Sequence, residues 1–362
     1  MGSSSVGIRD VAREAGVSVT TVSHVLNDVP SARVSPETRE KVRTTAARLG
    51  YGPNRLARAL RSRRSGVLGL VSEDMAATPH AGSIILGADH AARARGYTLM
   101  VITTVGPGGP GSREADVESL LERHVDGILY ASSHQRILRA PANLGNVPAV
   151  LVDAVAADGG LPAVVGDEYG GAAAATEALL AANHTRIGFL NNAEDIPSAR
   201  QRLRGFLDTM ASAGRENAVL NGASAPVETS SPDASGGYAA ARRMLAGGHP
   251  PSALFCYNDR MAMGAYRAAA ELGLSIPGGL SVVGFGDEEL IAANLHPGLA
   301  TVALPHREMG AWAANRLIDG IESAAVEAGA IQRPGVPDPV LLACRLVTRG
   351  SVSAPNTAVR QS

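Results

Sequence analysis

Residues 8–27 read IRDVAREAGVSVTTVSHVLN, and this stretch decides the architecture of the N-terminal part of the chain. Its apolar residues recur at helical spacing on both sides of a central turn, which predicts two short helices. Gly16 can end the first helix in a left-handed conformation, and Ser18 can cap the second. Because Val22 and Val25 fall on one face of the second helix, we expect both side chains to be buried.

The other face of the second helix, which is expected over residues 19–26, carries small and hydroxyl-bearing side chains. Its exposed positions are Val19, Thr20, Thr21, Ser23 and His24. A generic helix bundle would also bury valine and alanine, but it would not need hydroxyl groups along the exposed start of a helix. A helix-turn-helix motif places the first residues of its second helix against base edges in the major groove of DNA. The pattern therefore favours DNA binding.

The distribution of charge along the chain agrees with a nucleic-acid partner. Residues 1–65 contain twelve Lys or Arg and five Asp or Glu, a net charge of +7, whereas the remainder has a net charge of −8. A basic arm on an acidic body is typical of a polyanion-binding module attached to a part that binds no DNA. An ordinary charged helix bundle is the alternative that charge alone leaves open. A third helix is expected between its cap, Ser35, and Leu49, with Gly50 ending it.

Beyond residue 65 the sequence changes to short apolar runs that alternate with helical stretches. The runs are GVLGLVS, YTLMVIT, DGILYA, RIGFLN, ALFCYN and LSVVGF. This alternation predicts the α/β class, with parallel sheets wrapped in helices. Because this part spans about 280 residues, more than one sheet usually needs, we expect two doubly wound α/β subdomains.

Several classes of protein are disfavoured by what the sequence lacks. Cys256 and Cys344 are far apart in apolar runs, which suits neither a disulfide framework nor a metal site and agrees with a reducing cytosol. We find no apolar core of a signal peptide and no apolar stretch long enough to cross a bilayer. A Walker A loop, a nucleophile elbow, an HExxH motif and paired cysteine ligands are also missing from the sequence. We expect a cytoplasmic protein that is not an enzyme, needs no cofactor and no metal, and has no membrane partner.

An ordered set of motifs resembles the lac repressor family of transcriptional regulators. DVAREAGVS, TVSHVLN, VSPETREKV and LGYGPNRLARAL follow one another within residues 10–60, and VDGILY, HTRIGFL, SARQRLRGF, YNDRMAMGAY, LSVVGFGD and LPHREMG follow later. The resemblance covers nearly the whole chain. It implies a helix-turn-helix headpiece over residues 1–52, a hinge helix and linker over residues 53–65, and a periplasmic-binding-protein-like core over residues 66–350. Residues 351–362 would form a disordered polar tail.

The resemblance also implies which residues contact DNA. The side chains carried over by position as base contacts are Val19, Thr20, His24 and, from the hinge, Leu60. Those expected to contact the DNA backbone are Ser18, Thr21, Ser23, Asn27, Arg33, Asn54, Arg55 and Arg58. Residues 54–61 are too few for a stable isolated helix, so the resemblance implies that the hinge folds where two copies meet on DNA. Leu60 would then wedge into the minor groove and bend the duplex, with packing of Leu60 on the core as the alternative.

A cleft between the two core subdomains is where the resemblance places a small polar effector, a sugar or sugar derivative. The residues that match by position are His80, Asp153, Arg202, Asn258 and Asp287. Asp259 matches as well, with capping of its helix as an equal alternative. Arg202 is expected to be the main polar anchor, because its planar fork suits hydroxyl pairs or a carboxylate and no acidic partner is visible in the sequence. Gly286 stands where the family usually has an acid, which predicts that anionic effectors are better accepted.

These observations predict a sequence-specific DNA-binding transcriptional regulator, and in particular a repressor under allosteric control. One headpiece buries too little surface for tight specific binding, so a homodimer on a palindromic operator is expected. The polar C-terminal residues contain no leucine repeat that would pair dimers into tetramers. One alternative is that a protein or a nucleobase-like metabolite, rather than a sugar, is the corepressor. A transport-type binding protein would share the core but would not need the headpiece.

Overall fold

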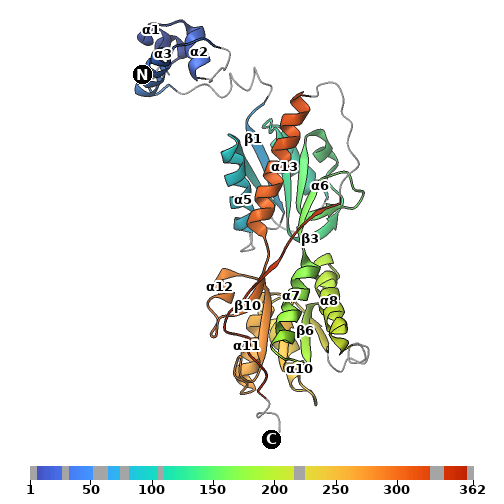
Figure 1. Ribbon diagram of the computed structural model, residues 1–362. Coiled ribbons are helices and arrows are strands. Elements are labelled where there is room, and N and C mark those ends of the chain that lie inside the picture. The colour runs from blue at the N-terminus through green and yellow to red at the C-terminus, as the bar shows by residue number, and fades with distance from the viewer. Residues whose placement is uncertain are drawn as a thin grey trace, which may run out of the picture. The chain divides into compact units, whose positions relative to one another are not determined.

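The computed structural model describes residues 6–26, 32–51, 64–73, 81–104, 110–215, 225–326 and 338–356. Its contacts divide the chain into two compact units, Met1–Gly66 and Val67–Ser362, each of which is described by itself. The described residues of the first unit form a bundle of short helices, here called the headpiece (Figure 1). Those of the second unit, here called the core, form two six-stranded sheets with helices packed against them.

The headpiece is held together by valine and alanine side chains. Helices α1 (Ile8–Ala15), α2 (Val19–Leu26) and α3 (Pro36–Arg48) enclose Val11, Ala15, Val22, Val25 and Val42, all fully buried. The expected ends of these helices are confirmed. Gly16 follows α1 with φ 67°, and Ser35 accepts a hydrogen bond from the Thr38 N–H at 3.2 Å. The local caps and the apolar spacing thus specify the same bundle.

The first subdomain of the core is a parallel sheet. Its strands are β1 (Val67–Glu73), β2 (Thr98–Thr104), β3 (Gly127–Leu138), β4 (Ala149–Ala156), β5 (Ala163–Gly166) and β11 (Val340–Leu342), in the order β11-β5-β4-β3-β1-β2. Helices α5 (Ala81–Ala94), α6 (Pro110–Leu121) and α13 (His306–Val326) pack against it, and η1 (Ala142–Asn146) is a short 3-10 helix. The apolar run predicted to end at Ala131 continues to Leu138, because β3 bulges and then pairs with β4 again.

The second subdomain repeats this architecture with one change. Its strands are β6 (Ile187–Asn192), β7 (Val227–Ser230), β8 (Ala253–Cys256), β9 (Ser281–Gly286), β10 (Ala300–Ala303) and β12 (Arg345–Val347), in the order β12-β10-β9-β8-β6-β7. The helices are α7 (Glu168–Ala181), α8 (Pro197–Met210), α10 (Ala234–Leu245), α11 (Asp259–Glu271) and the short α12 (Glu289–Ala292), with a π-helical turn, η2 (Ala211–Arg215), after α8. Strand β12 is antiparallel to β10, because it arrives directly from β11 of the first sheet instead of through a crossover helix. The prediction of two α/β subdomains is confirmed.

Aromatic packing is concentrated in the second subdomain. The chain has four phenylalanines, and all of them are fully buried there. Phe189 and Phe255 stack with their ring centroids 4.8 Å apart, and Phe206 and Phe285 lie against this pair. The rest of the core is built mainly from aliphatic side chains, with Tyr97 and Tyr130 among the buried residues of the first subdomain. Phe285 ends this cluster on the side that meets Arg202.

The chain passes between the two subdomains three times, at neighbouring points (Figure 1). The connections run from β5 to α7, from β10 to α13 and from β11 to β12. Gly166 lies where these connections meet, because a Cβ atom there would touch Leu304 and Cys344 at 3.0 and 3.2 Å. Three short, adjacent connections permit one subdomain to rotate against the other while both keep their own sheets.

One segment differs from what its composition suggests. Residues 351–356, assigned to a polar tail, pack against β9: the buried Ser351 hydroxyl donates to the Val282 carbonyl at 2.6 Å, and the Ser353 N–H donates to Ser281. Between these two serines, Val352 packs against the apolar core of the second subdomain, so the segment is held by both kinds of contact. Within the described ranges, no helix combines the length and apolar character needed to cross a bilayer.

Helices α5 and α13 are in backbone contact through glycines. A Cβ atom at Gly87 would overlap the carbonyl group of Arg307, and one at Gly310 would overlap the carbonyl group of Ile84. Further along α13, a Cβ atom at Gly320 would have nothing within 4 Å. In α13, close packing therefore requires a glycine at position 310 but not at position 320.

Gly310→Ala is expected to destabilise the core, with Gly320→Ala as the matched control. The first change forces two backbones apart, at a cost on the order of 1–3 kcal/mol. The second replaces a helix-interior glycine in open space and should stabilise the core by about 0.5–1 kcal/mol. Thermal unfolding followed by circular dichroism measures both effects, and equal melting temperatures for the two variants would contradict the close packing of α5 on α13.

Candidate functional site

The turn between α1 and α2 positions the exposed start of α2. Gly16 adopts the left-handed conformation that favours glycine, and the Val17 N–H donates to the Ala12 carbonyl at 3.0 Å, which closes the end of α1. The Ser18 hydroxyl then accepts a hydrogen bond from the Thr21 N–H at 3.0 Å and so caps α2, as predicted. The chain therefore reverses direction in a few residues and presents the first turn of α2 to solvent.

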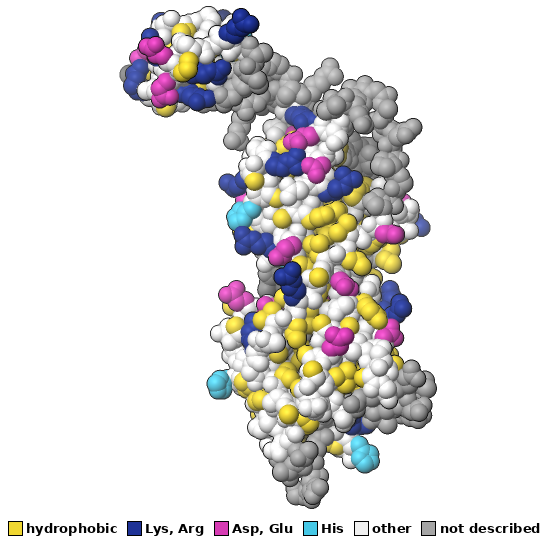
Figure 2. Space-filling view, in the orientation of Figure 1, with side chains coloured by type: hydrophobic (Ala, Val, Ile, Leu, Met, Phe, Trp, Pro, Cys, Tyr) yellow, Lys and Arg dark blue, Asp and Glu magenta, His cyan; other side chains and the backbone are white. Residues whose placement is uncertain are grey.

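The predicted DNA contacts in α2 share one exposed region. Val19 is 42% exposed although it is apolar, and Thr20 is exposed beside it. Thr21, Ser23 and His24 are half-buried, and Arg33 is exposed in the segment before α3. Figure 2 shows Lys and Arg side chains spread over the surface of the headpiece. This surface combines an apolar contact, hydroxyl donors and positive charge, which is the chemistry that a DNA major groove requires.

Some predicted contacts cannot be placed. Asn27, Asn54, Arg55, Arg58, Leu60 and His80 lie outside the described residues. The hinge and the minor-groove wedge therefore stay predictions, as does the contact of His80 with an effector.

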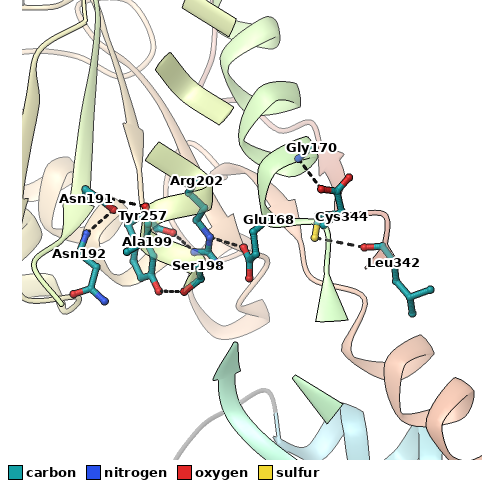
Figure 3. Close-up of polar contacts among 11 residues, drawn as sticks. Glu168, Gly170, Asn191, Asn192, Ser198, Ala199, Arg202, Tyr257, Leu342 and Cys344 are labelled. Atoms are coloured by element: carbon teal, nitrogen blue, oxygen red, sulfur yellow. Dashed lines mark hydrogen bonds and ion pairs between the residues drawn. The ribbon is translucent and has the colours of Figure 1, made fainter. Parts of the chain in front are cut away.

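Arg202 of α8 is buried at the centre of a polar network near the junction of the two subdomains (Figure 3). Its Nε donates to Glu168 Oε2 at 2.6 Å, and its Nη1 donates to the Tyr257 carbonyl. The guanidinium also lies 3.7 Å from the ring centroid of Phe285 and 4.4 Å from that of Tyr257. Burial lowers the pKa of Arg202, but the charge of Glu168, the hydrogen bond to Glu168 and the nearby Tyr257 together raise it above its ordinary value, so Arg202 stays charged.

The expectation that Arg202 has no acidic partner is wrong. Glu168 is that partner, and the two side chains are only 5% and 2% exposed. Glu168 is the first residue of α7, directly after the cap Asp167, whose carboxylate accepts from the Gly170 N–H at 2.8 Å. Because Glu168 and Arg202 are 34 residues apart on different helices, no local spacing in the sequence indicates their pairing.

Asp153 lies within β4, where the pairing with β3 shifts, and its backbone has an unusual conformation. Its φ is 54°, its exposed fraction is 4%, and its Oδ1 has no hydrogen-bond partner among the described residues. Burial and the nearby charge of Glu168 raise the pKa of Asp153 to about 8, although Arg202 and Arg136 act in the opposite direction. A strained backbone and an unsatisfied buried carboxyl group together are typical of a ligand site.

The other predicted effector contacts are engaged by the protein itself. The Asn258 side chain caps α11, where it accepts from the Met261 N–H at 2.8 Å and donates to the Pro232 carbonyl at 2.9 Å. The cap of α11 is therefore Asn258 and not Asp259. Their contact with an effector stays a prediction.

Asp259 and Asp287 both hold the loop that follows β9. Asp259 accepts hydrogen bonds from the Thr301 hydroxyl and from the Glu288 N–H, and burial raises the pKa of Asp259 to about 6. Asp287 forms an ion pair with Arg349 at 2.7 Å. The contact of Asp287 with an effector stays a prediction.

Comparison with known proteins identifies the family. Residues 7–54 match bacterial regulatory proteins of the lacI family, and residues 176–352 match a periplasmic binding protein-like domain. The ribose operon repressor of Escherichia coli (strain K12) is 32% identical over 329 residues, which cover 90% of this chain and 96% of that relative. The chain belongs to the lacI family of bacterial regulatory proteins.

Two further comparisons extend over most of this lacI-family protein. The HTH-type transcriptional repressor PurR of Serratia proteamaculans (strain 568) is 31% identical over 331 residues, with 90% of this chain and 93% of that relative covered. The crystal structure of the lac repressor dimer bound to operator and the anti-inducer ONPF has a TM-score of 0.73 and 29% identity, covering 97% of this chain and all of that chain. The predicted fold class and the prediction of a DNA-binding transcriptional regulator are confirmed.

Asp153→Asn is expected to stabilise the core increasingly as the pH rises. The folded-state pKa of Asp153, about 8, lies above its ordinary value of 3.8. Folding therefore costs free energy once the carboxyl group loses its proton in the unfolded chain, and this cost grows until the pH passes about 8. Asparagine tolerates the left-handed conformation and carries no charge.

The measurement is the melting temperature of the wild type and the variant between acidic and mildly alkaline pH. Asp158→Asn, in the exposed turn after β4, is the matched control. As the pH rises, the melting temperature of the wild type should fall relative to that of Asp153→Asn. The difference between the wild type and Asp158→Asn should stay constant. Parallel pH profiles for all three proteins would show that the Asp153 carboxyl is not destabilised by burial.

Proposed function

We propose that this lacI-family regulator is a homodimeric repressor that binds a palindromic operator under the control of a small polar effector. The observation that supports DNA binding most directly is the exposed start of α2, where Val19 and Thr20 project from a headpiece region of net charge +7. A surface valine beside exposed hydroxyl groups adds little to the fold, whereas it suits contact with the methyl groups and edges of bases. The DNA partner places the proposed site of action in the cytoplasm.

The proposed roles in DNA binding divide by chemistry. Val19 would contact a thymine methyl group, Thr20 would exchange hydrogen bonds with base edges, and His24 would reach a base at the far end of the same face. Ser18, Thr21, Ser23 and Arg33 would hold phosphates, together with Asn27, Asn54, Arg55 and Arg58, while Leu60 would wedge into the minor groove. Residues 1–52 would thus read the half-site and residues 53–65 would couple it to the core.

Two copies of the chain are proposed because one short recognition helix reads too few base pairs for a unique site. The lac repressor, similar over 97% of this chain, is solved as a dimer on its operator. The C-terminal residues carry no leucine repeat, so the proposed assembly is a dimer and not a tetramer.

The proposed effector site is the junction where Asp153 and Arg202 meet. Three adjacent connections join the two subdomains there, so a ligand that binds both can change their relative orientation and thereby the spacing of two headpieces. The name of the ribose operon repressor makes a sugar or sugar derivative the first candidate. The alternative is that a nucleobase-like metabolite or a protein is the corepressor. Such a corepressor would bind without the hydroxyl groups that a sugar brings to this junction.

Thr20→Ala is expected to weaken binding to the specific operator, with Thr44→Ala as the matched control. Both threonines are exposed helix residues, but Thr44 lies on α3. Loss of one base-edge hydrogen bond should cost about 1–3 kcal/mol on the operator, and random DNA of the same length should bind the variant like the wild type.

The operator is first selected from a random duplex pool, and affinities are then measured by fluorescence anisotropy over a range of salt concentrations. Binding to random DNA should weaken steeply with salt, with a logarithmic slope of about 0.9 for each phosphate neutralised. A Thr20→Ala variant that binds operator as tightly as Thr44→Ala would remove Thr20 from the recognition surface. Salt-independent binding would contradict DNA recognition by the headpiece.

A further inference from the structure

The segment that leads into α3 contains a tight turn centred on Arg33. The Val34 N–H donates to the Ala32 carbonyl at 2.9 Å, so the turn closes across a single residue. Val34 is partly buried against the apolar core of the headpiece, whereas Arg33 is exposed. Arg33 therefore stands at the apex of the turn, and the fold holds the residues on either side of it.

Arg39 of α3 reaches back to this turn and binds both of its ends. Its Nη2 donates to the Ala32 carbonyl at 3.1 Å, and its Nε donates to the Val34 carbonyl at 3.3 Å. Both nitrogens belong to one planar guanidinium, so a single rigid group fixes the carbonyls on either side of Arg33. The Ala32 carbonyl accepts from both Val34 and Arg39, which uses its two lone pairs.

These contacts set Arg39 apart from an ordinary surface arginine. Arg13 of α1, for comparison, forms an exposed ion pair with Asp10. The Arg39 side chain is instead half-buried, and its hydrogen bonds go to main-chain carbonyls. Within the described part of the headpiece, no acid pairs with the Arg33 guanidinium at the apex. The turn thus presents a positive charge that these acids do not neutralise.

A turn that is formed before binding makes a phosphate contact more favourable. A segment that must be ordered on binding loses conformational entropy at that moment, whereas a segment fixed by the fold does not. A lysine at position 39 would carry the same charge, but its ammonium group is a point charge and has no planar fork to span two carbonyls. The shape of the guanidinium of Arg39, in addition to its charge, is therefore required to hold the turn.

We infer that Arg39 is a positioning residue for DNA binding, which holds the turn that presents Arg33 to a phosphate and does not contact DNA itself. The inference rests on the proposed function, because Arg33 is a proposed phosphate contact. Phosphates carry no sequence information, so the contribution of Arg39 extends equally to operator and to random DNA. Thr20, in contrast, is proposed to act on the operator alone.

The test uses Arg39→Lys in the full-length protein, alone and combined with Arg33→Ala. Affinities for the selected operator and for random DNA are measured by fluorescence anisotropy over a range of salt concentrations. Arg39→Lys should weaken binding about three- to tenfold on both DNAs. It should also lower the logarithmic salt slope by up to about 0.9, the contribution of one phosphate. In the Arg33→Ala background it should cause no further loss, because the side chain that it positions is absent.

The controls separate positioning from charge and from stability. Arg13→Lys keeps the charge at a side chain that is 79% exposed, and this variant should bind both DNAs like the wild type. Circular dichroism reports whether each variant is folded. A general weakening of the headpiece would reduce binding in the Arg33→Ala background as well, so the combined variant distinguishes a structural role from a positioning role.

Every other outcome contradicts the inference. It is overturned by wild-type affinity of Arg39→Lys, by wild-type affinity of Arg33→Ala, or by an equal loss from Arg39→Lys with and without Arg33. Unfolding of the headpiece in Arg39→Lys would also overturn it, because Arg39 would then support the whole bundle instead of one side chain. Failure of the proposed function is seen separately, as the absence of specific, salt-dependent DNA binding by the wild type.

Discussion

The buried ion pair between Glu168 and Arg202 is the interaction on which the arrangement of the core depends. It joins the first turn of α7 to α8, and through Arg202 it also reaches the loop after β8 and the aromatic cluster that ends at Phe285. Removing either partner would leave a buried charge without compensation, which is strongly destabilising. The pair therefore fixes four elements of the second subdomain at the edge that faces the first.

This position links the stability of the core to its proposed regulation. Helix α7 begins directly after β5, so Glu168 follows one of the three connections between the subdomains. On the other side of the junction, Asp153 and the bulge of β3 present polar atoms that the fold does not satisfy. A ligand that contacted these atoms and the second subdomain together would favour one relative orientation of the two subdomains, which is what the proposed control of the headpiece requires.

Local features of this protein could be predicted from the sequence, and non-local ones could not. Gly16, Ser18 and Ser35 act on residues within one turn, so their capping roles follow from spacing alone. The apolar runs likewise indicated six of the twelve strands that the structure describes: β1, β2, β3, β6, β8 and β9. They did not indicate the other six, among them the antiparallel β12, whose direction depends on where the chain returns. Glu168 and Arg202 are 34 residues apart on different helices, so no spacing in the sequence indicates their pairing or the strained backbone of Asp153.

A double-mutant cycle on Glu168 and Arg202 tests this account most directly. Free energies of unfolding are measured by urea titration for the wild type, Glu168→Gln, Arg202→Met and the double variant. Each single change should cost several kcal/mol, on the order of 3–5, because it leaves the other charge buried and uncompensated. The double variant should be clearly more stable than the sum of the single costs implies. Additive costs, with a coupling below about 0.5 kcal/mol, would contradict the claim that Glu168 neutralises Arg202 within the fold.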